Sequence, residues 1–332
     1  MLHDGTFAPG ARYLTFGGVE TFLIYRQGVA LREFCSFEAL DDEAAWADFV
    51  DDFLRPIAES AAIHGFGLLT DTLGWRASPD YLTRLGHAPE DVARYAKLGA
   101  ARVRQFAERH VTARSVVLAA DLGPRGDGYA LEATGPVAVE AAERYHRPQL
   151  EAIAQSGVDL VTAWTMTSVA ESIGVARVAK DLGLPLIVSP TLETDGKAVD
   201  GASLGDFVTR VDEATDGYPL LYTANCVHPD HIEPALRDAK DRDAPWRRRF
   251  RGLRANASAK SHAELDASTE LDRGDPAALG AHVARLAVEH DLAIVGGCCG
   301  TDPEHLEAIA RGVQERTRRD PRRASHGLRA TR

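Results

Sequence analysis

Short apolar runs alternate along the chain with longer segments in which apolar residues recur every three or four positions. The longer segments have the periodicity of amphipathic helices and include residues 41–62, 136–156, 168–182 and 276–290. The short runs are predicted as eight strands: residues 13–16, 66–70, 115–120, 158–163, 186–189, 220–224, 250–255 and 292–296. The chain is therefore expected to repeat a strand–helix unit eight times.

The residues between these segments favour a closed barrel. Gly183 and Pro185 precede the fifth predicted strand, and glycine followed by proline is an order that ends helices. Strands that alternate with helices form a parallel sheet covered by helices. Because the chain lacks a glycine-rich dinucleotide fingerprint, we expect a single-domain α/β fold, a (β/α)8 TIM barrel over residues 10–315. Residues 122–132 are expected to form a loop after the third strand.

Composition and charge exclude several classes of protein. The 332 residues include 49 Asp and Glu against 38 Lys and Arg, a formal net charge of −11. An acidic surface repels a phosphate backbone, so no nucleic-acid partner is expected. No apolar run approaches the roughly 18 residues of a membrane span, and residues 1–9 lack the order of a secretion signal, so we expect no membrane partner and a cytoplasmic location. Residues 316–332 are Arg-rich and are expected to form a basic, disordered tail.

Three of the four cysteines follow predicted strands, at the end where a barrel collects its chemistry. Cys226 comes just after the sixth strand, and Cys298 and Cys299 come just after the eighth. Adjacent cysteines are poorly placed for a mutual disulfide, because consecutive Cα atoms lie only about 3.8 Å apart. Glycines on both sides of the pair allow both thiols to face one point. Three soft thiolates at one point predict a Zn²⁺ site with its fourth position open.

Other residues compete for a place in this site. Cys35 is a possible fourth ligand, but its setting between phenylalanines favours a buried, apolar role. His228, His231 and His305 lie close to the cysteines in the sequence. Each of them also lies beside a proline and an acidic residue, a pattern typical of a helix start, which is the interpretation we adopt.

The ligand set indicates the chemistry of the site. Bound Zn²⁺ favours deprotonation of a thiol. Three protein thiolates donate enough electron density that a further thiolate in the fourth position stays nucleophilic, which suits alkyl transfer to sulfur. Zinc hydrolases more often use His and carboxylate ligands around a bound water, so hydrolysis is the weaker alternative.

At these residues the sequence resembles the homocysteine S-methyltransferase family. Residues 296–301, Gly-Gly-Cys-Cys-Gly-Thr, are similar to its C-terminal zinc motif, and Asn225-Cys226 is similar to the motif of its first cysteine. Residues 145–149, Tyr-His-Arg-Pro-Gln, match a middle stretch of the family. The resemblance extends over about residues 14–309. It implies a TIM barrel that transfers a methyl group to the zinc-bound thiol of homocysteine, giving methionine.

Other residues near the predicted strand ends are expected to take part in this chemistry. Asn225 and Asn256 would orient the site or the substrate by hydrogen bonds, although asparagines that cap loops are nearly as good an explanation. Contacts with the small-molecule substrates are expected from Thr21, Trp75, Trp164 and Thr165. Aromatic faces such as those of Trp75 and Trp164 attract cationic sulfonium groups, although Trp75 is equally well explained by ordinary packing.

The methyl donor is limited by the length of the chain. At 332 residues there is no room beside a barrel for a cobalamin module or a folate barrel. The expected donor is therefore a small sulfonium compound, S-methylmethionine or S-adenosylmethionine, although a separate corrinoid protein remains an alternative. The short basic tail gives no support for an oligomerisation arm like that of the betaine users in the family, so the sequence indicates no oligomeric state.

Two positions depart from the family pattern. Phe16 stands where the first-strand motif usually has an aspartate, and Trp164 stands where the fourth strand usually ends in a glutamate. In the family these carboxylates help to hold the amino group of homocysteine. Either another acid takes over, with Glu20 the first candidate and Glu193 the second, or the acceptor is a different thiol or a selenol. A non-catalytic zinc-binding barrel that acts through its basic tail is the alternative from another class.

Overall fold

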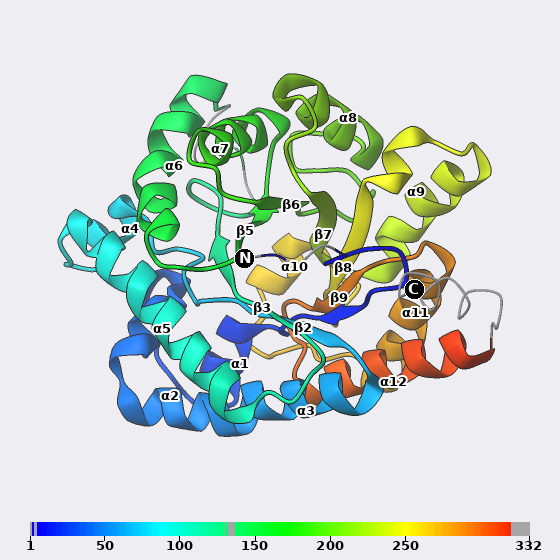
Figure 1. The fold of residues 1–332 in the computed structure, drawn as a ribbon, viewed down its shortest axis with the longest axis horizontal. Helices are drawn as coiled ribbons and strands as arrows, with labels where there is room; N and C mark the ends of the chain where they lie inside the picture. The colour runs from blue at the N-terminus through cyan, green and yellow to red at the C-terminus, as the bar shows by residue number, and fades with distance from the viewer. Residues whose placement is uncertain (1, 3–4, 130, 132–136, 320–332) are drawn as a thin grey trace.

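Parallel strands form the centre of the structure, a computed structural model that describes residues 2, 5–129, 131 and 137–319. Helices surround these strands on all sides, as Figure 1 shows. The described strands are β1 (Tyr13–Leu14), β2 (Gly67–Leu69), β3 (Val116–Val117), β4 (Ala119–Leu122), β5 (Leu160–Met166), β6 (Leu186–Pro190), β7 (Leu221–Val227), β8 (Phe250–Ala255) and β9 (Ile294–Gly297).

The order of the strands is that of a barrel. The sheet runs β3-β2-β1-β9-β8-β7-β6-β5-β4, and every pairing in it is parallel. Its two edge strands, β3 and β4, are consecutive pieces of the predicted third strand, separated by Leu118. The sheet therefore closes on itself at this residue, and the predicted (β/α)8 TIM barrel is confirmed.

A threonine side chain joins the two pieces of the third strand. The Thr70 hydroxyl donates a hydrogen bond to the Val117 carbonyl, at 3.2 Å. The same oxygen accepts a hydrogen bond from the Ala119 N–H, also at 3.2 Å. Backbone groups that lose a ladder partner inside a protein need a substitute. Thr70 supplies it where β3 and β4 part.

The helices cover the outside of the barrel in chain order. Helix α12 packs against both α11 and α3, so the last helix lies beside the first ones (Figure 1). The helices are α1 (Val19–Tyr25), α2 (Glu43–Phe49), α3 (Arg55–His64), α4 (Pro79–Arg84), α5 (Val92–His110), α6 (Val139–Ala154), α7 (Val169–Asp181), α8 (Leu204–Thr215), α9 (Pro229–Asp241), α10 (His262–Asp266), α11 (Pro276–Glu289) and α12 (Pro303–Arg319).

Shorter helical turns complete the set. A π-helical turn (Val50–Leu54) joins α2 to α3, so the predicted helix 41–62 is nearly continuous. Asp42 begins this helix by accepting hydrogen bonds from the N–H groups of Ala44 and Ala45, the usual task of an N-cap carboxylate. The 3₁₀ turns are Arg32–Phe34, Ser36–Asp41, Pro89–Asp91 and Pro245–Arg248.

The interior of the barrel is closed by apolar side chains at the end where the strands begin. A cluster of buried residues fills this end: Tyr13, Leu69, Val117, Ala119, Leu160, Ile187, Leu221 and Ile294. Leu2, Phe7 and Ala11 from the N-terminal segment pack against that cluster. A larger core lies between the strands and the helices. The polar side chains described below therefore lie at the opposite end, where the strands finish.

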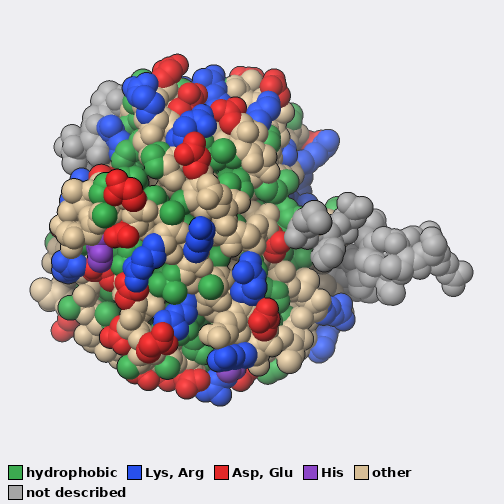
Figure 2. Space-filling model, turned by 60° about the vertical axis from the view of Figure 1, so that its left-hand side comes forward, with side chains coloured by type: hydrophobic (Ala, Val, Ile, Leu, Met, Phe, Trp, Pro, Cys, Tyr) green, Lys and Arg blue, Asp and Glu red, His purple; other side chains and the backbone are tan. Residues whose placement is uncertain are grey.

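Some predicted segments differ from the observed ones or fall outside the description. Helix α12 continues to Arg319, so residues 316–319 are helical rather than part of a tail. Residues 320–332, residues 130 and 132 of the predicted loop and the first residue of the predicted helix 136–156 lie outside the described residues. No described helix has the length and apolar character needed to cross a membrane. On the face shown in Figure 2, basic and acidic side chains are interspersed.

Replacing Thr70 by valine should weaken the barrel where it closes. The substitution keeps the shape of the side chain but leaves the Ala119 N–H without its acceptor, which costs about 1–3 kcal/mol of unfolding free energy. Urea denaturation measures this loss. Thr223→Val is the matched control, because the Thr223 hydroxyl is buried without a hydrogen-bond partner among the described residues. Equal stability of the two variants would contradict the role of Thr70.

Candidate metal centre

Three cysteine sulfurs lie together where β7 and β9 end. The Sγ atoms of Cys226, Cys298 and Cys299 all lie within 4.8 Å of one another. Cys226 is the second-to-last residue of β7 and has a positive φ of 51°. Cys298 and Cys299 follow β9 directly. The structure thus brings together the three cysteines that the sequence predicts as ligands. It joins Cys226 and Cys298 as a disulfide, so three-sulfur binding of a metal requires this pair in its reduced form.

The strand between them sets the spacing of the cysteines. Asn225 of β7 is in register with Arg254 of β8, and Arg254 is in register with Gly296 of β9. The residues that follow this row therefore emerge side by side at the barrel mouth. The Cα atoms of Cys226 and Cys298 are 5.4 Å apart. Strand register thus brings together residues that are 72 positions apart in the sequence.

The loop after β9 is folded tightly by hydrogen bonds to Cys298. Its carbonyl accepts from the Thr301 hydroxyl at 2.7 Å and from the Thr301 N–H at 3.1 Å. A Cβ on Gly297 would overlap the Thr301 side chain, so this tight turn requires glycine. Thr21 supports the loop from behind, where its hydroxyl accepts a hydrogen bond from the Gly300 N–H at 3.3 Å. Thr21, which the sequence suggested as a substrate contact, does not line the cavity described below.

Asn225 connects the cysteines to two neighbouring strands. Its side-chain oxygen accepts hydrogen bonds from the Thr165 N–H and the Ser189 hydroxyl, both at 2.8 Å. Its amide nitrogen donates to the Thr165 hydroxyl at 2.8 Å and to Cys226 Sγ at 3.3 Å. The same nitrogen lies 3.9 Å from Cys298 Sγ. Every polar atom of this buried amide is used, so it holds a fixed N–H group toward the sulfurs.

A tyrosine hydroxyl also contacts the sulfurs. The Tyr129 hydroxyl donates to Cys226 Sγ at 3.3 Å and lies 3.8 Å from Cys299 Sγ. Burial raises the pKa of Tyr129 well above its ordinary value, so the group stays a neutral donor. Burial likewise raises the pKa of the Cys299 thiol to about 11. In the absence of a metal, this thiol therefore keeps its proton at neutral pH.

A histidine and a glutamate lie behind Tyr129. The His262 ring lies 4.2 Å from the Tyr129 ring, and its Nε2 is 2.8 Å from the Cys226 carbonyl oxygen. Its Nδ1 is 2.9 Å from Glu193 Oε1. Glu193, the second acid that the sequence offered as a partner for an amino group, is thus engaged by His262 and does not line the cavity.

A cavity of about 50 Å³ adjoins the three sulfurs. Besides the cysteines, its described lining consists of Val19, Glu20, Phe34, Asp71, Trp75, Asp121, Tyr129, Trp164, Thr165, Asn225 and Arg254. Three carboxylates and one guanidinium face this space, so its lining is acidic apart from the thiols. An acidic cavity favours the binding of cations.

The two departures from the family pattern have different surroundings. Phe16 is fully buried, with its ring 6.4 Å from that of Phe53, and does not line the cavity. Trp164 lines the cavity, and its Nε1 donates to Asp71 Oδ1 at 2.9 Å. The guanidinium carbon of Arg254 lies 4.5 Å from the centre of the Trp164 ring. An aromatic residue with a cation over its face thus stands where the family has a glutamate.

Glu20 is the acid nearest in sequence to Phe16 that reaches the cavity. Its Oε1 accepts a hydrogen bond from the Ser36 hydroxyl at 2.8 Å. Burial raises the pKa of this carboxyl above its usual range, although the Ser36 hydroxyl favours the charged form. A cationic ligand beside Glu20 would lower its pKa again, so this carboxyl is suited to pairing with an ammonium group.

Asp71 and Asp121 belong to the cavity but were not predicted from the sequence. Asp121 Oδ1 accepts hydrogen bonds from the N–H groups of Thr72 and Gly74, both at 2.9 Å, and thereby holds the loop that carries Trp75. Burial raises the pKa of Asp71 to about 6, opposed by the nearby Arg254 guanidinium. Both follow apolar runs at strand ends, and that position is the signal that would have found them.

The remaining candidates lie apart from the sulfurs. His228 is the N-cap of α9, and His305 lies in the first turn of α12 with its Nδ1 2.8 Å from Asp302 Oδ1. His231 also belongs to α9, so all three histidines are at helix starts as expected. Asn256 is buried but does not line the cavity, and its Oδ1 has no hydrogen-bond partner among the described residues.

Cys35 is fully buried and separate from the group of three sulfurs. Its Sγ is 3.5 Å from the Glu33 carbonyl oxygen, and burial raises its pKa to about 12. The structure therefore places Cys35 in the core, where it packs as a small apolar side chain.

Comparisons with known proteins agree with this arrangement. A family model described as homocysteine S-methyltransferase matches residues 17–313. The homocysteine S-methyltransferase YbgG of Bacillus subtilis (strain 168) is 25% identical over 207 residues, which are 58% of this chain and 60% of YbgG. The chain thus aligns with less than two thirds of that relative.

Solved structures share the fold. The metallated form of the homocysteine methyltransferase MmuM from Escherichia coli matches with a TM-score of 0.67 at 18% identity, over 91% of this chain and 96% of that chain. Its oxidized form matches with the same TM-score and identity, over 91% of this chain and 95% of that chain. At this identity the likeness shows the barrel fold alone.

Removing one sulfur should abolish metal binding. In the reduced protein, Cys298→Ala leaves two thiolates, and we expect the metal content after dialysis to fall from about one ion per chain to below about a tenth of that. Elemental analysis of the dialysed protein measures this. Cys35→Ala is the control and should keep its metal, because Cys35 lies outside the group of sulfurs. Full metal content in the Cys298 variant would contradict the three-sulfur site.

Proposed function

The chain belongs to the homocysteine S-methyltransferase family, and we propose that it moves a methyl group from a small sulfonium donor to the thiol of homocysteine, giving methionine. We further propose that Cys226, Cys298 and Cys299 hold Zn²⁺ for this reaction. The observation that carries the proposal is the set of three sulfurs within 4.8 Å of one another beside a cavity. Three thiolates fit a tetrahedral zinc ion and leave one position for a substrate.

The fit of the sulfurs to zinc rests on their chemistry and surroundings. Thiolates are soft ligands that select zinc over magnesium or calcium. When bound, the ion would lower the pKa of the acceptor thiol and hold it as a thiolate. The N–H of Asn225 and the hydroxyl of Tyr129 donate toward the cysteine sulfurs, so they stabilise negative charge there and fix the orientation of the ligands.

The acidic lining of the cavity supports a cationic methyl donor. Glu20, Asp71 and Asp121 face the space against the single positive charge of Arg254. The aromatic side chains of Trp75 and Trp164 also line it and attract sulfonium groups by their faces. These features suit S-methylmethionine and S-adenosylmethionine equally well, and both carry a positively charged sulfur.

The reaction is a single displacement whose atoms balance without another reagent. The acceptor thiol gives its proton to solvent, and its sulfur forms a bond to the methyl carbon. The bond between that carbon and the donor sulfur breaks, and its electron pair stays on the donor, which leaves as a neutral thioether. No described side chain needs to take up a proton during methyl transfer, so the contribution of the protein is to hold the two sulfur atoms in line.

Glu20 is proposed to hold the ammonium group of homocysteine. The family's aspartate position is a buried phenylalanine here, and its glutamate position is a tryptophan already bonded to Asp71. Asp121 is committed to the loop before Trp75, and Asp71 is paired with Arg254. Glu20 lines the same cavity, where its Oε1 accepts a hydrogen bond from the Ser36 hydroxyl, and no basic side chain among the described residues forms an ion pair with it. It is therefore the carboxylate best able to accept a new partner.

The same two departures support a second candidate function. Without the family's carboxylates at positions 16 and 164, the site has fewer partners for the amino group of an acceptor. The chain would then methylate a different thiol or a selenol by the same displacement. A panel of acceptors separates the two candidates.

Zinc-loaded, reduced protein should form methionine from homocysteine with S-methylmethionine, with S-adenosylmethionine, or with both. Chromatography of the product, with isotopic label in the donor methyl group, measures the transfer. The Cys298→Ala variant is the control and should be inactive. Turnover of other thiols or selenols but not of homocysteine would overturn the first candidate and support the second.

Glu20→Gln should reduce the turnover of homocysteine specifically. Losing the charged partner of the ammonium should lower kcat/KM for homocysteine by about 10- to 100-fold. The same variant should have the kcat/KM of the unmodified protein for 4-mercaptobutyrate, which lacks the amino group. Glu193→Gln is the control, since Glu193 lies outside the cavity. An equal loss with both acceptors would contradict the proposed contact with the ammonium group.

A further inference from the structure

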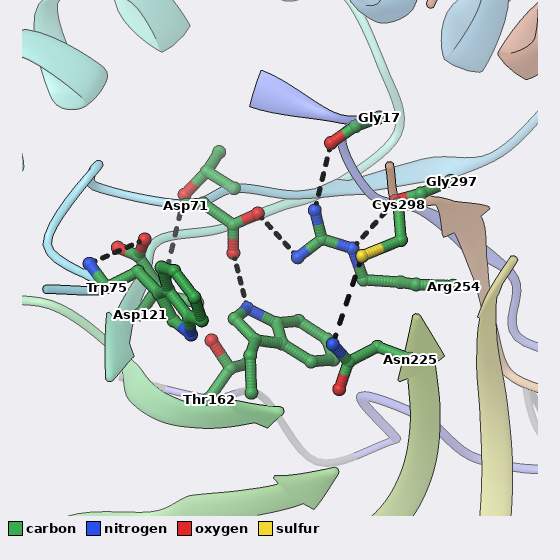
Figure 3. A network of polar contacts seen from close by, with 12 residues as sticks. Gly17, Asp71, Trp75, Asp121, Thr162, Asn225, Arg254, Gly297 and Cys298 are labelled. Carbon is green, nitrogen blue, oxygen red and sulfur yellow. Dashed lines mark hydrogen bonds and ion pairs between the residues drawn. The ribbon is translucent and has the colours of Figure 1, made fainter. Parts of the chain in front are cut away.

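Arg254 is a charged residue buried inside the barrel mouth. It belongs to β8, between the strands that carry the cysteines, and only 6% of its surface is exposed. Figure 3 shows its guanidinium between Asp71 on one side and the carbonyl groups of Gly17 and Gly297 on the other. The family resemblance gave no role for this residue, and the sequence alone places it in an apolar strand. A buried arginine of this kind requires partners for its charge and its N–H groups.

The guanidinium makes three hydrogen bonds to three other strand ends. Nε donates to the Gly297 carbonyl at 3.0 Å, and Nη2 donates to the Gly17 carbonyl at 3.1 Å. Nη1 donates to Asp71 Oδ2 at 2.9 Å. These partners follow or end β9, β1 and β2, respectively. The planar fork of arginine fixes the relative directions of these bonds, which a lysine ammonium cannot do.

Two of these bonds hold backbone segments that adjoin Cys298, one in the chain and one in space. Gly297 immediately precedes Cys298 in the chain. Gly18, which follows Gly17, lies so close to the Cys298 carbonyl that a Cβ there would be 2.6 Å from that oxygen. Arg254 therefore fixes both the strand end that leads into Cys298 and the segment that packs against its backbone.

Charge gives Arg254 a second connection to the sulfurs. Three thiolates with one divalent cation carry a net charge of −1, and a fourth thiolate makes it −2. Among the described residues that line the cavity, Arg254 is the one with a positive charge. A fixed cation in the lining of the same cavity reduces the cost of collecting negative charge in a buried site.

We propose that Arg254 is a positioning residue of the metal centre. It orients the Cys298 segment through the Gly17 and Gly297 carbonyls and offsets the negative charge of the thiolate ligands. The inference rests on the metal site of the proposed function, but it concerns metal affinity and geometry rather than the identity of the methyl acceptor.

The test compares four variants by their metal affinity. Arg254→Met removes the fork and the charge, and Arg254→Lys keeps the charge without the fork. Asp71→Asn removes the partner carboxylate, and the double variant R254M/D71N removes the ion pair as a whole. Arg251→Met is the matched control, because Arg251 lies on the same strand and pairs with Asp291, outside the cavity. Zn²⁺ affinity is measured by competition with a chromophoric chelator, and Co²⁺ absorption reports the geometry of the sulfur ligands.

We expect R254M to bind Zn²⁺ about 10- to 100-fold more weakly, the usual effect of removing a residue that supports a metal ligand. R254K should lie between this variant and the wild type, with altered Co²⁺ bands. R254M/D71N should remain as weak as R254M. D71N should weaken binding less than R254M does, because Arg254 keeps its charge and its bonds to the Gly17 and Gly297 carbonyls. R251M should bind as the wild type does. Melting temperatures of the metal-free proteins identify any variant that fails to fold.

Recovery of wild-type affinity in R254M/D71N would overturn the inference, because Arg254 would then serve only to neutralise Asp71. Wild-type affinity in R254M itself would overturn it as well. These outcomes differ from a failure of the proposed function. If the wild type bound no metal, the zinc site itself would be wrong. If it bound metal but did not methylate homocysteine, the role of Arg254 would stand while the acceptor would change.

Discussion

The register of three neighbouring strands is the constraint on which this structure depends. Asn225, Arg254 and Gly296 form one row across β7, β8 and β9, and the residues beyond that row include the three cysteines of the candidate metal centre. A one-residue slip of a strand would turn its side chains to the opposite face of the sheet. The sulfur of Cys226 would then face away from Cys298 and Cys299. The closure of the barrel therefore matters for chemistry as well as for stability.

Burying a polar group at the barrel mouth costs free energy unless the group has a hydrogen-bond partner. In this site several groups share the same partners. The Asn225 side chain forms hydrogen bonds with Thr165, Ser189 and Cys226 at the same time. Asp71 accepts from both Trp164 and Arg254. Because each of these groups is held by several others, the sulfurs lie in a preorganised setting. Glu20 accepts a hydrogen bond from Ser36 but has no ion-pair partner among the described residues, so its charge is left for a ligand.

Much of this architecture could be predicted from the sequence, because strand ends and helix starts leave local signals. The alternation of strands and helices predicted the barrel, and the position of the cysteines after two strands predicted that they would meet. The prolines beside His228 and His305 correctly indicated helix starts rather than ligands. The split of the third strand at Leu118 had no local signal, since it follows from closing the ring between β2 and β5.

The contacts of single side chains were less predictable. The sequence suggested Thr21 as a substrate contact, yet it supports the Cys298 loop from behind because its hydroxyl accepts a hydrogen bond from the Gly300 N–H. The sequence places Arg254 in a strand but does not indicate its partners. Those partners come from the ends of three other strands, which the fold brings next to Arg254. Tyr129 comes from a loop, where periodicity carries no information about direction. Such residues are placed by tertiary contacts that no short stretch of sequence contains.

The central claim is that three protein sulfurs hold a zinc ion whose fourth position receives the acceptor. X-ray absorption spectroscopy of the reduced, zinc-loaded protein tests this most directly, before and after homocysteine is added. The account predicts three sulfur ligands at about 2.3 Å with one lighter atom, changing to four sulfur ligands on addition. A spectrum with four protein ligands that homocysteine leaves unchanged would contradict it.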